Sequence, residues 1–196
     1  MSCNYKKKGI YSAILKEQMK QIIHIFGASG SGTTTLGQAI ADRTGYRFLD
    51  SDDYLWLPTD PQYTTKRPSE ERLALLERDI DASGGAVVSG SLVGWGDALM
   101  DRFTLAVRLV VPHDERMARI ERRELDRYGD RILPGGDMYQ IHRDFLQWAA
   151  GYEDGPATMR SRAMHDLWQQ KLTCPLLILD GTQPVEDLVN EVLKTR

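Results

Sequence analysis

Residues 21–53 read QIIHIFGASGSGTTTLGQAIADRTGYRFLDSDD, and this stretch decides the fold. It begins with a short apolar run, residues 21–26, whose isoleucine content predicts a buried strand. A glycine-rich turn follows, and residues 33–44 then place Leu36 and Ile40 on one side of a predicted helix. A strand, a glycine turn and a helix in direct succession predict the start of an α/β domain.

The turn between strand and helix fits a phosphate-binding loop, whose pattern is G-x-x-x-x-G-K-[ST]. Gly27 and Gly32 stand at the two glycine positions, and Thr34 stands at the hydroxyl position that holds Mg²⁺. Glycines let backbone N–H groups wrap around phosphates, and the helix N-terminus adds its free N–H groups and positive dipole end. Thr33 stands where the pattern has lysine. Another cation must then reach the γ-phosphate, or the protein binds nucleotide without much turnover.

Two other interpretations compete with the phosphate-binding loop. One is an ordinary strand–turn–helix with a flexible glycine turn. The other is a dinucleotide fingerprint, G-x-G-x-x-G, which would use Gly30 and Gly32 with Asp50 near the ribose position, but which has Thr35 in place of its third glycine. Three consecutive threonines suit phosphate and metal better. The residues expected to contact ATP here are Gly27, Ser29, Gly30, Ser31, Gly32, Thr33, Thr34 and Thr35.

The rest of the chain alternates strands and helices. Further strands are predicted at 46–50, 86–89, 104–111 and 176–180, and further helices from 69, over 114–128, from 137, after 156 and over 184–193. This alternation predicts a parallel sheet covered on both faces. Residues 57–68 are polar and punctuated by prolines, which predicts a loop. Three helices between the fourth and fifth strands exceed what a crossover requires, so residues 113–172 are expected to include a lid or cap.

Composition bounds the class of protein. With 196 residues, 41% of them hydrophobic and 27% charged, the chain has enough apolar material for one α/β domain, expected over 20–196. A net charge of −3 argues against a dedicated nucleic-acid surface. Two cysteines favour a reducing, cytoplasmic setting, and no apolar run is long enough to span a membrane. Residues 1–19 lack the apolar core of a signal peptide and are expected to form a tail.

Both ends of the domain resemble known kinases. The stretch FGASGSGTTTLGQAIADRTGYRFLDSDD resembles the start of a small kinase of the nucleoside monophosphate, shikimate and gluconate kinase group. The closing LILDGTQPVEDLVNEVL is similar to the end of adenylate kinase, where a D-G-T-x-P-V turn follows the last strand. The resemblance implies a P-loop three-layer sandwich, a five-stranded parallel sheet in the order 2-3-1-4-5, a helical lid, and ATP with Mg²⁺. It also implies that adenine lies between Arg119 and the turn formed by Gly181, Thr182 and Pro184.

Three carboxylates, Asp50, Asp52 and Asp53, follow the second strand. Ligands bind at this edge of a parallel sheet, where a carboxylate can orient Mg²⁺-bound water or accept the proton of an attacking hydroxyl. The pattern is similar to the D-S-D of shikimate kinases and the G-D-D of gluconate kinases, which implies Asp50 near Mg²⁺ together with Thr34, and Asp52 and Asp53 at the acceptor. The alternative is a solvated turn or helix cap. Gly90, after the third strand, leaves room for the acceptor.

Four arginines, Arg116, Arg119, Arg123 and Arg127, fall on one face of the helix predicted at 114–128. The pattern resembles the lid of a nucleotide kinase, and it implies Arg119 and Arg123 as the catalytic pair that clamps phosphates, since guanidinium groups bind phosphoryl oxygens in a bidentate way. Acidic residues lie between the arginines, so a salt-bridged, solvent-exposed helix is the alternative.

Other basic and aromatic residues bear on the acceptor. Lys66 and Arg67, in the predicted loop, suggest an anionic acceptor, and ordinary exposed loop charges are the alternative. Arg160 and Arg162 are weaker candidates than Arg119 and Arg123 for the phosphate clamp. Three aromatic residues are expected to pack between helices: Phe145, Trp148 and Trp168. The sequence thus predicts an ATP-dependent kinase that phosphorylates a small acceptor, either a nucleoside monophosphate or a small hydroxy compound. The alternative is a nucleotide-binding sensor or interaction module without efficient catalysis.

Overall fold

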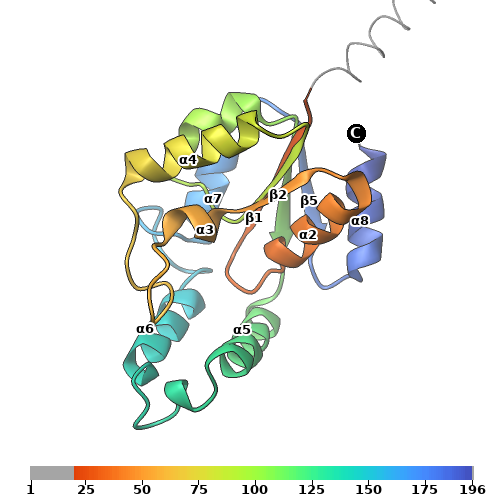
Figure 1. Cartoon of the computed structure of the whole chain (residues 1–196). Coiled ribbons are helices and arrows are strands. Elements are labelled where there is room, and N and C mark those ends of the chain that lie inside the picture. Colours follow the sequence, from red (N-terminus) through yellow and green to blue (C-terminus); the bar gives the residue numbers. More distant parts are fainter. Residues whose placement is uncertain (1–19, 196) are drawn as a thin grey trace, which may run out of the picture.

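The computed structural model describes residues 20–195 (Figure 1), and the tail expected at 1–19 lies outside them. A five-stranded parallel sheet in the order β2-β3-β1-β4-β5 forms its centre, which confirms the predicted sheet. The strands are β1 (Ile22–Gly27), β2 (Arg47–Asp50), β3 (Ala86–Ser89), β4 (Leu105–Val110) and β5 (Leu176–Asp180). The central strand β1 is buried along its whole length, as its apolar run predicts.

Helices cover both faces of the sheet. They are α2 (Thr33–Thr44), α3 (Ser51–Leu55), α4 (Ser69–Asp81), α5 (His113–Tyr128), α6 (Tyr139–Ala150), α7 (Arg162–Gln169) and α8 (Val185–Lys194), with short 3₁₀ turns η1 (Asp97–Arg102) and η2 (Gly129–Ile132). On one face, Leu36 and Ile40 of α2 pack with apolar residues of α8. On the other, Leu76 of α4 and Trp168 of α7 pack with η1. Each such fully buried large apolar side chain contributes about 1.5–3 kcal/mol.

Three short elements differ from the sequence prediction. The helix α3 begins at Ser51, where no helix was predicted from the sequence and where a solvated turn or a helix cap was the alternative for the aspartates. Asp50 is such a cap, because its carboxylate accepts a hydrogen bond from the Asp52 backbone N–H at 3.0 Å. Five residues are too few to show a helical apolar period, and the same limit hides η1 and η2.

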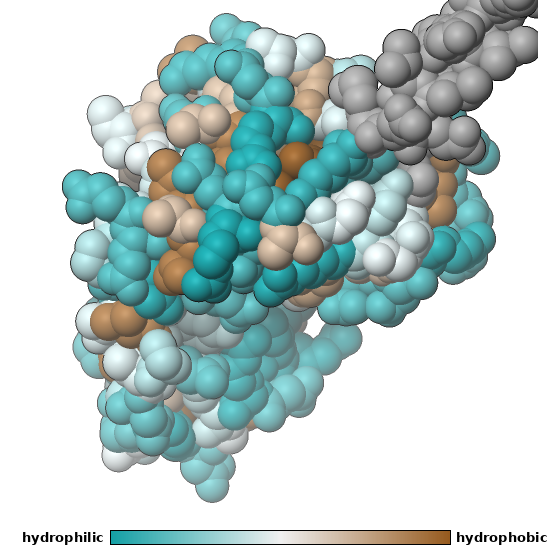
Figure 2. Space-filling model, turned by 45° about the horizontal axis from the view of Figure 1, so that its top comes forward, coloured by the Kyte–Doolittle hydropathy of each residue, from teal (hydrophilic) through white to brown (hydrophobic). Residues whose placement is uncertain are grey.

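The helices α5 and α6 extend beyond the sheet, below it in Figure 1, and the loop between α3 and α4 reaches down beside them. An ion pair between Arg131 and Asp60 at 2.9 Å joins that loop to η2. Figure 2 shows one face of the molecule, on which hydrophobic residues are scattered among hydrophilic ones. Within residues 20–195 no helix is long and apolar enough to cross a membrane.

Candidate active site

The glycine-rich loop joins β1 to α2 and packs against α5. Gly30 and Gly32 have φ values of +80° and +91°, a backbone conformation that side chains other than glycine rarely adopt. A Cβ atom on Gly30 would also lie 2.6 Å from the backbone carbonyl oxygen of Arg116. The predicted glycine positions therefore follow from the path of the loop and from the helix that covers it.

Arg116 differs from the other arginines of α5. Its side chain is buried, its Nη1 donates to the Ser29 carbonyl oxygen at 2.9 Å, and its Nη2 donates to both carboxylate oxygens of Glu153 at 2.7 Å. The Tyr152 ring lies 5.2 Å from its guanidinium carbon. Although helical spacing groups Arg116 with Arg119 and Arg123, the Arg116 side chain supports the glycine-rich loop through its hydrogen bond to Ser29.

A cavity of about 1010 Å³ opens between the glycine-rich loop, α3, the loop after α3, α5 and α6. The residues predicted as site residues that line it are Gly27, Ser29, Gly30, Gly32, Thr33, Thr34, Thr35, Asp50, Asp52, Asp53, Lys66, Gly90, Arg119 and Arg123. Five others do not: Ser31, Arg67, Gly181, Thr182 and Pro184. The cavity is therefore one space that reaches from the predicted phosphate site to the predicted acceptor site.

Thr34 and Asp50 meet at the floor of this cavity. The Thr34 hydroxyl donates to Asp50 Oδ2 at 2.9 Å, and burial raises the pKa of the Asp50 carboxyl above its ordinary value. Burial and then the neighbouring Asp52 likewise raise the pKa of Asp53. A hydroxyl and a carboxylate are hard oxygen donors of the kind that Mg²⁺ takes alongside waters and substrate phosphates. Their arrangement fits this ion, although no cluster of three His, Cys, Asp or Glu ligands exists among the described residues.

The turn after β5 lies behind the glycine-rich loop. Gly181 is buried, and a Cβ atom on it would lie 2.9 Å from the Ser31 carbonyl oxygen. Arg119 Nη1 donates to the Gly181 carbonyl oxygen at 3.0 Å. Arg119 thus contacts this turn directly, while Gly181, Thr182 and Pro184 do not line the cavity, and an adenine between Arg119 and the turn stays a prediction.

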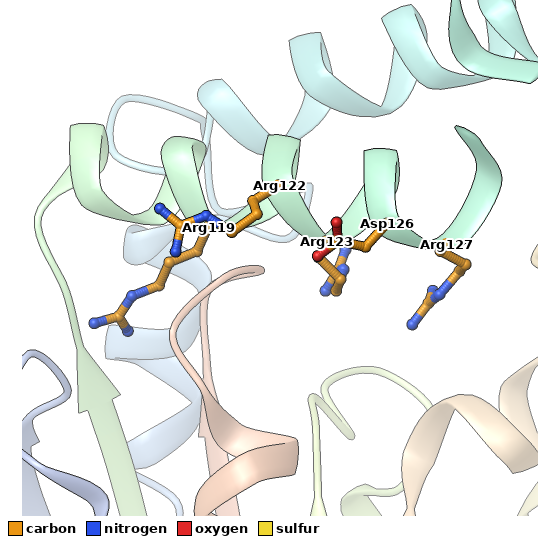
Figure 3. A pocket seen from close by; sticks show the side chains of 5 residues that line it. All are labelled: Arg119, Arg122, Arg123, Asp126 and Arg127. Atoms are coloured by element: carbon orange, nitrogen blue, oxygen red, sulfur yellow. The ribbon is translucent and has the colours of Figure 1, made fainter. Parts of the chain in front are cut away.

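Further along α5, three arginines project from the side that faces the glycine-rich loop (Figure 3). Arg119, Arg123 and Arg127 line a smaller hollow together with Arg122 and Asp126. Arg123 pairs with Glu124 at 2.8 Å, and Arg119 pairs with Glu115 at 3.0 Å. Arg119 and Arg123 are therefore salt-bridged and also reach the cavity, and their role as a phosphate clamp stays a prediction.

On the acceptor side, Lys66 and Arg67 have different surroundings, and only Lys66 lines the cavity. Arg67 donates to the Tyr54 carbonyl oxygen and to Glu71, so that it joins the loop to the start of α4. Lys66 lines the cavity, and no ion pair holds it within residues 20–195. Arg160 also lines the cavity without a carboxylate partner among the described residues. Arg160, a weaker candidate in the sequence analysis, lies in the irregular segment that precedes α7.

The glycine-rich loop follows the central strand of a parallel sheet in the order β2-β3-β1-β4-β5. This arrangement is that of a small P-loop kinase of the nucleoside monophosphate kinase-like group. The family described as "AAA domain" matches residues 23–133, and the chain belongs to it. This chain is 42% identical over 175 residues to the uncharacterized protein YqaC of Bacillus subtilis, and the alignment covers 89% of this chain and 97% of that protein. A shikimate kinase 2 of Yersinia enterocolitica is 49% identical over 37 residues, 19% of this chain and 21% of that one.

Solved structures agree on the fold. A shikimate kinase from Bacteroides thetaiotaomicron superposes with a TM-score of 0.54 at 17% identity, covering 89% of this chain and 97% of that one. A gluconokinase from Sinorhizobium meliloti superposes with a TM-score of 0.51 at 19% identity, covering 90% and 91%. These neighbours confirm the fold expected from the glycine-rich loop and from the closing turn.

Proposed function

We propose that the protein transfers the γ-phosphoryl group of ATP to a small anionic acceptor. The observation that carries the proposal is the Thr34 to Asp50 hydrogen bond at 2.9 Å, which stands in one cavity with Asp52 and several cations. Phosphoryl transfer needs such a site because its catalysis consists of positioning and charge stabilisation. The alignment with a shikimate kinase 2, though short, supports a kinase whose acceptor is a small molecule.

Each group has a defined task in this reaction. The backbone N–H groups of the glycine-rich loop and of the α2 N-terminus bind the phosphates. Thr34 and Asp50 would hold Mg²⁺, which neutralises charge on the phosphate oxygens when it is bound. Asp52 orients the attacking oxygen of the acceptor and accepts its proton if that oxygen belongs to a hydroxyl. The new P–O bond forms as the bond from the γ-phosphorus to the β–γ bridging oxygen breaks, and ADP leaves.

The cations of the cavity replace the missing lysine and recognise the acceptor. Arg123 lies on the wall formed by α5, and we assign to it the positive charge that Thr33 cannot supply. Lys66 and Arg160 lie on the acceptor side, where burial lowers the pKa of Arg160 and the charge of Asp52 partly restores it. Arg160 is half-buried, and a partly desolvated cation without a paired carboxylate favours an anionic ligand.

Thr33 also supports a second candidate function, a nucleotide sensor that binds ATP without turning it over. The glycine-rich loop and the Mg²⁺ ligands would serve both functions equally. The two functions differ in the roles of Arg123 and Asp52, which matter only for transfer. Tight Mg-ATP binding without phosphoryl transfer to any of a broad panel of nucleoside monophosphates and hydroxy acids would identify the sensor.

The first test is Thr34→Ala, with Thr173→Ala as the matched control on the surface away from the cavity. We expect Thr34→Ala to weaken Mg-ATP binding about tenfold or more, because it removes a proposed metal ligand. Calorimetry with and without Mg²⁺ measures the effect, and the loss should appear only when Mg²⁺ is present. An unchanged Mg-ATP affinity would mean that the loop does not hold a metal–nucleotide complex.

A further inference from the structure

The acceptor side of the cavity is lined by aromatic rings from two separate segments. Trp56 and Tyr63 come from the loop after α3, and Phe145 and Trp148 come from α6. Phe145 and Trp148 lie three residues apart on one helix face, with ring centroids 5.9 Å apart and planes inclined by 28°. Trp56 and Tyr63 meet edge to face at 6.2 Å. The sequence predicted Phe145 and Trp148 as helix-packing residues, but both face the cavity.

A cation lies over each of these four rings. The distances to the ring centroids are 5.6 Å for Lys66 over Trp56, 5.2 Å for Arg127 over Tyr63, 5.9 Å for Arg123 over Phe145 and 5.3 Å for Arg160 over Trp148. Cations favour the electron-rich face of a ring, so each pair presents a flat surface next to a positive charge. Flat surfaces beside cations are the elements with which proteins bind stacked bases and their phosphates.

The same walls also carry hydrogen-bonding side chains. Outside the glycine-rich loop and α2, the neutral polar ones that line the cavity include Ser51, Gln62, Tyr63, Ser91, Tyr128 and His142. Ser91 is already engaged with His165 at 3.1 Å. The distinctive feature of the acceptor side is the pairing of each ring with a positive charge, and this pairing favours a flat molecule that carries a negative charge.

We propose that the acceptor is a flat, conjugated ring compound that carries an anionic group. Its ring stacks on the surface formed by Phe145 and Trp148, and its anion lies beside Arg160. The tyrosine and tryptophan of the loop after α3 cover the ring from the other segment. The phosphoryl-transfer step rests on the proposed function, whereas binding of the flat anion does not.

The test is calorimetry on the full chain saturated with a non-hydrolysable ATP analogue and Mg²⁺, so that the ATP site is filled. The probes are pyrimidine and purine nucleoside monophosphates, the matching nucleosides that lack the anion, and shikimate and gluconate, which are anions without an aromatic ring. We expect at least one nucleoside monophosphate to bind about tenfold or more tightly than its nucleoside and than both acids. Equal or tighter binding of shikimate or gluconate overturns the proposal.

Substitutions in α6 test where the ring of the acceptor binds. Phe145→Leu and Trp148→Leu should each weaken binding of the preferred monophosphate about tenfold, the scale of stacking one base on an aromatic side chain. Tyr139→Leu, on the same helix but outside the cavity, is the matched control. Mg-ATP affinity should stay unchanged in all three variants, which shows that they fold. If both cavity variants bind the monophosphate as Tyr139→Leu does, the ring does not stack on α6.

Phosphoryl transfer is measured separately with ATP in place of the analogue. Transfer to shikimate or gluconate in preference to any flat anion would retain the proposed kinase activity and overturn the aromatic acceptor. Tight binding of a flat anion without transfer would do the reverse, since it supports the ring site and contradicts the kinase. The two proposals therefore fail in distinguishable ways.

Discussion

The two ends of helix α5 use the same residue type in opposite ways. At the first turn, Arg116 is buried, pairs with Glu153 and donates to the backbone of the glycine-rich loop. Towards the other end, Arg123 and Arg127 are exposed and lie over the Phe145 and Tyr63 rings. The first arrangement is a desolvated charge network, in which loss of one partner is costly. The second consists of contacts worth about 0.5–1 kcal/mol each.

This contrast teaches that burial, and not residue type, separates a supporting arginine from one that meets a ligand. The guanidinium of Arg116 is enclosed, and its Nη1 and Nη2 already donate to Ser29 and Glu153, so it has little left to offer a phosphate. Arg123 is exposed and donates to Glu124 through Nε and Nη2, which leaves its Nη1 to meet a ligand. The two ends should therefore respond to substitution in different measurements, the first in stability and the second in turnover.

The largest expected effect belongs to Arg116→Met. Removing one partner leaves Glu153 charged and partly buried, so the free energy of unfolding should fall by about 3–5 kcal/mol. Urea denaturation measures it, and Arg122→Met, an exposed arginine of the same helix, is the control with an expected change within about 0.5 kcal/mol. If the two variants are equally stable, the contrast between the ends of α5 does not exist.

Next in size is Arg123→Ala, which should leave stability nearly unchanged and lower the rate of phosphoryl transfer about 10²-fold, the scale for losing one preorganised charge. Thr33→Lys should change the unmodified protein little, because the site already carries that charge, and should restore part of the loss in the double variant. Arg122→Ala is the control. Full activity of Arg123→Ala would show that the far end of α5 takes no part in transfer.

The smallest effect concerns His165, which supports the first turn of α5 through Tyr152. Its Nδ1 lies 2.8 Å from the Tyr152 hydroxyl, and burial, followed by Arg160 and Arg108, lowers its pKa from 6.5 to about 3. As the pH falls below 6.5 the unfolded chain takes up a proton that the folded chain refuses, so stability declines on acidification. Between pH 6.5 and 5.5 this group should cost about 1 kcal/mol of unfolding free energy.

His165→Gln provides the comparison for that measurement. Denaturation at several pH values should give a shallower dependence in the variant, since the titrating ring is gone. His24, whose pKa is lowered to about 4 by burial, remains in both proteins and cancels. Parallel curves for the two proteins would mean that His165 has the same pKa in the folded and unfolded states, so that burial does not lower it.

The glycine-rich loop, which is contiguous in the chain, could be predicted from the sequence. The other walls of the cavity come from separate segments, and their roles were left open. Residues 27–34 can be recognised from the sequence alone, because the spacing of their glycines and the helix that follows do not depend on which segments pack around them. Arg116 and Arg123 are seven residues apart on one helical face, so no periodicity can say which one is buried. Phe145 and Trp148 present the same difficulty, since the spacing that packs a helix also lines a cavity.

The acceptor side depends on contacts between distant segments. Arg160 reaches the Trp148 ring from an irregular segment, and Tyr63 reaches Arg127 across 64 positions of the chain. Neither pairing leaves a local pattern in a single sequence. What the sequence did carry was the charge of Lys66, which the structure places at the cavity without an ion pair within the described part of the chain.

Asp50 serves local folding and the cavity with one carboxylate, as the cap of α3 and as the partner of Thr34. Its Oδ1 would still be needed for α3 in a relative that had lost all enzymatic activity, because loss of an N-cap costs about 1 kcal/mol. An aspartate or asparagine at this position in a related sequence is therefore poor evidence that the related protein is an active enzyme. The retention of Thr34 is the more informative marker, since its hydroxyl makes no contact that α2 requires.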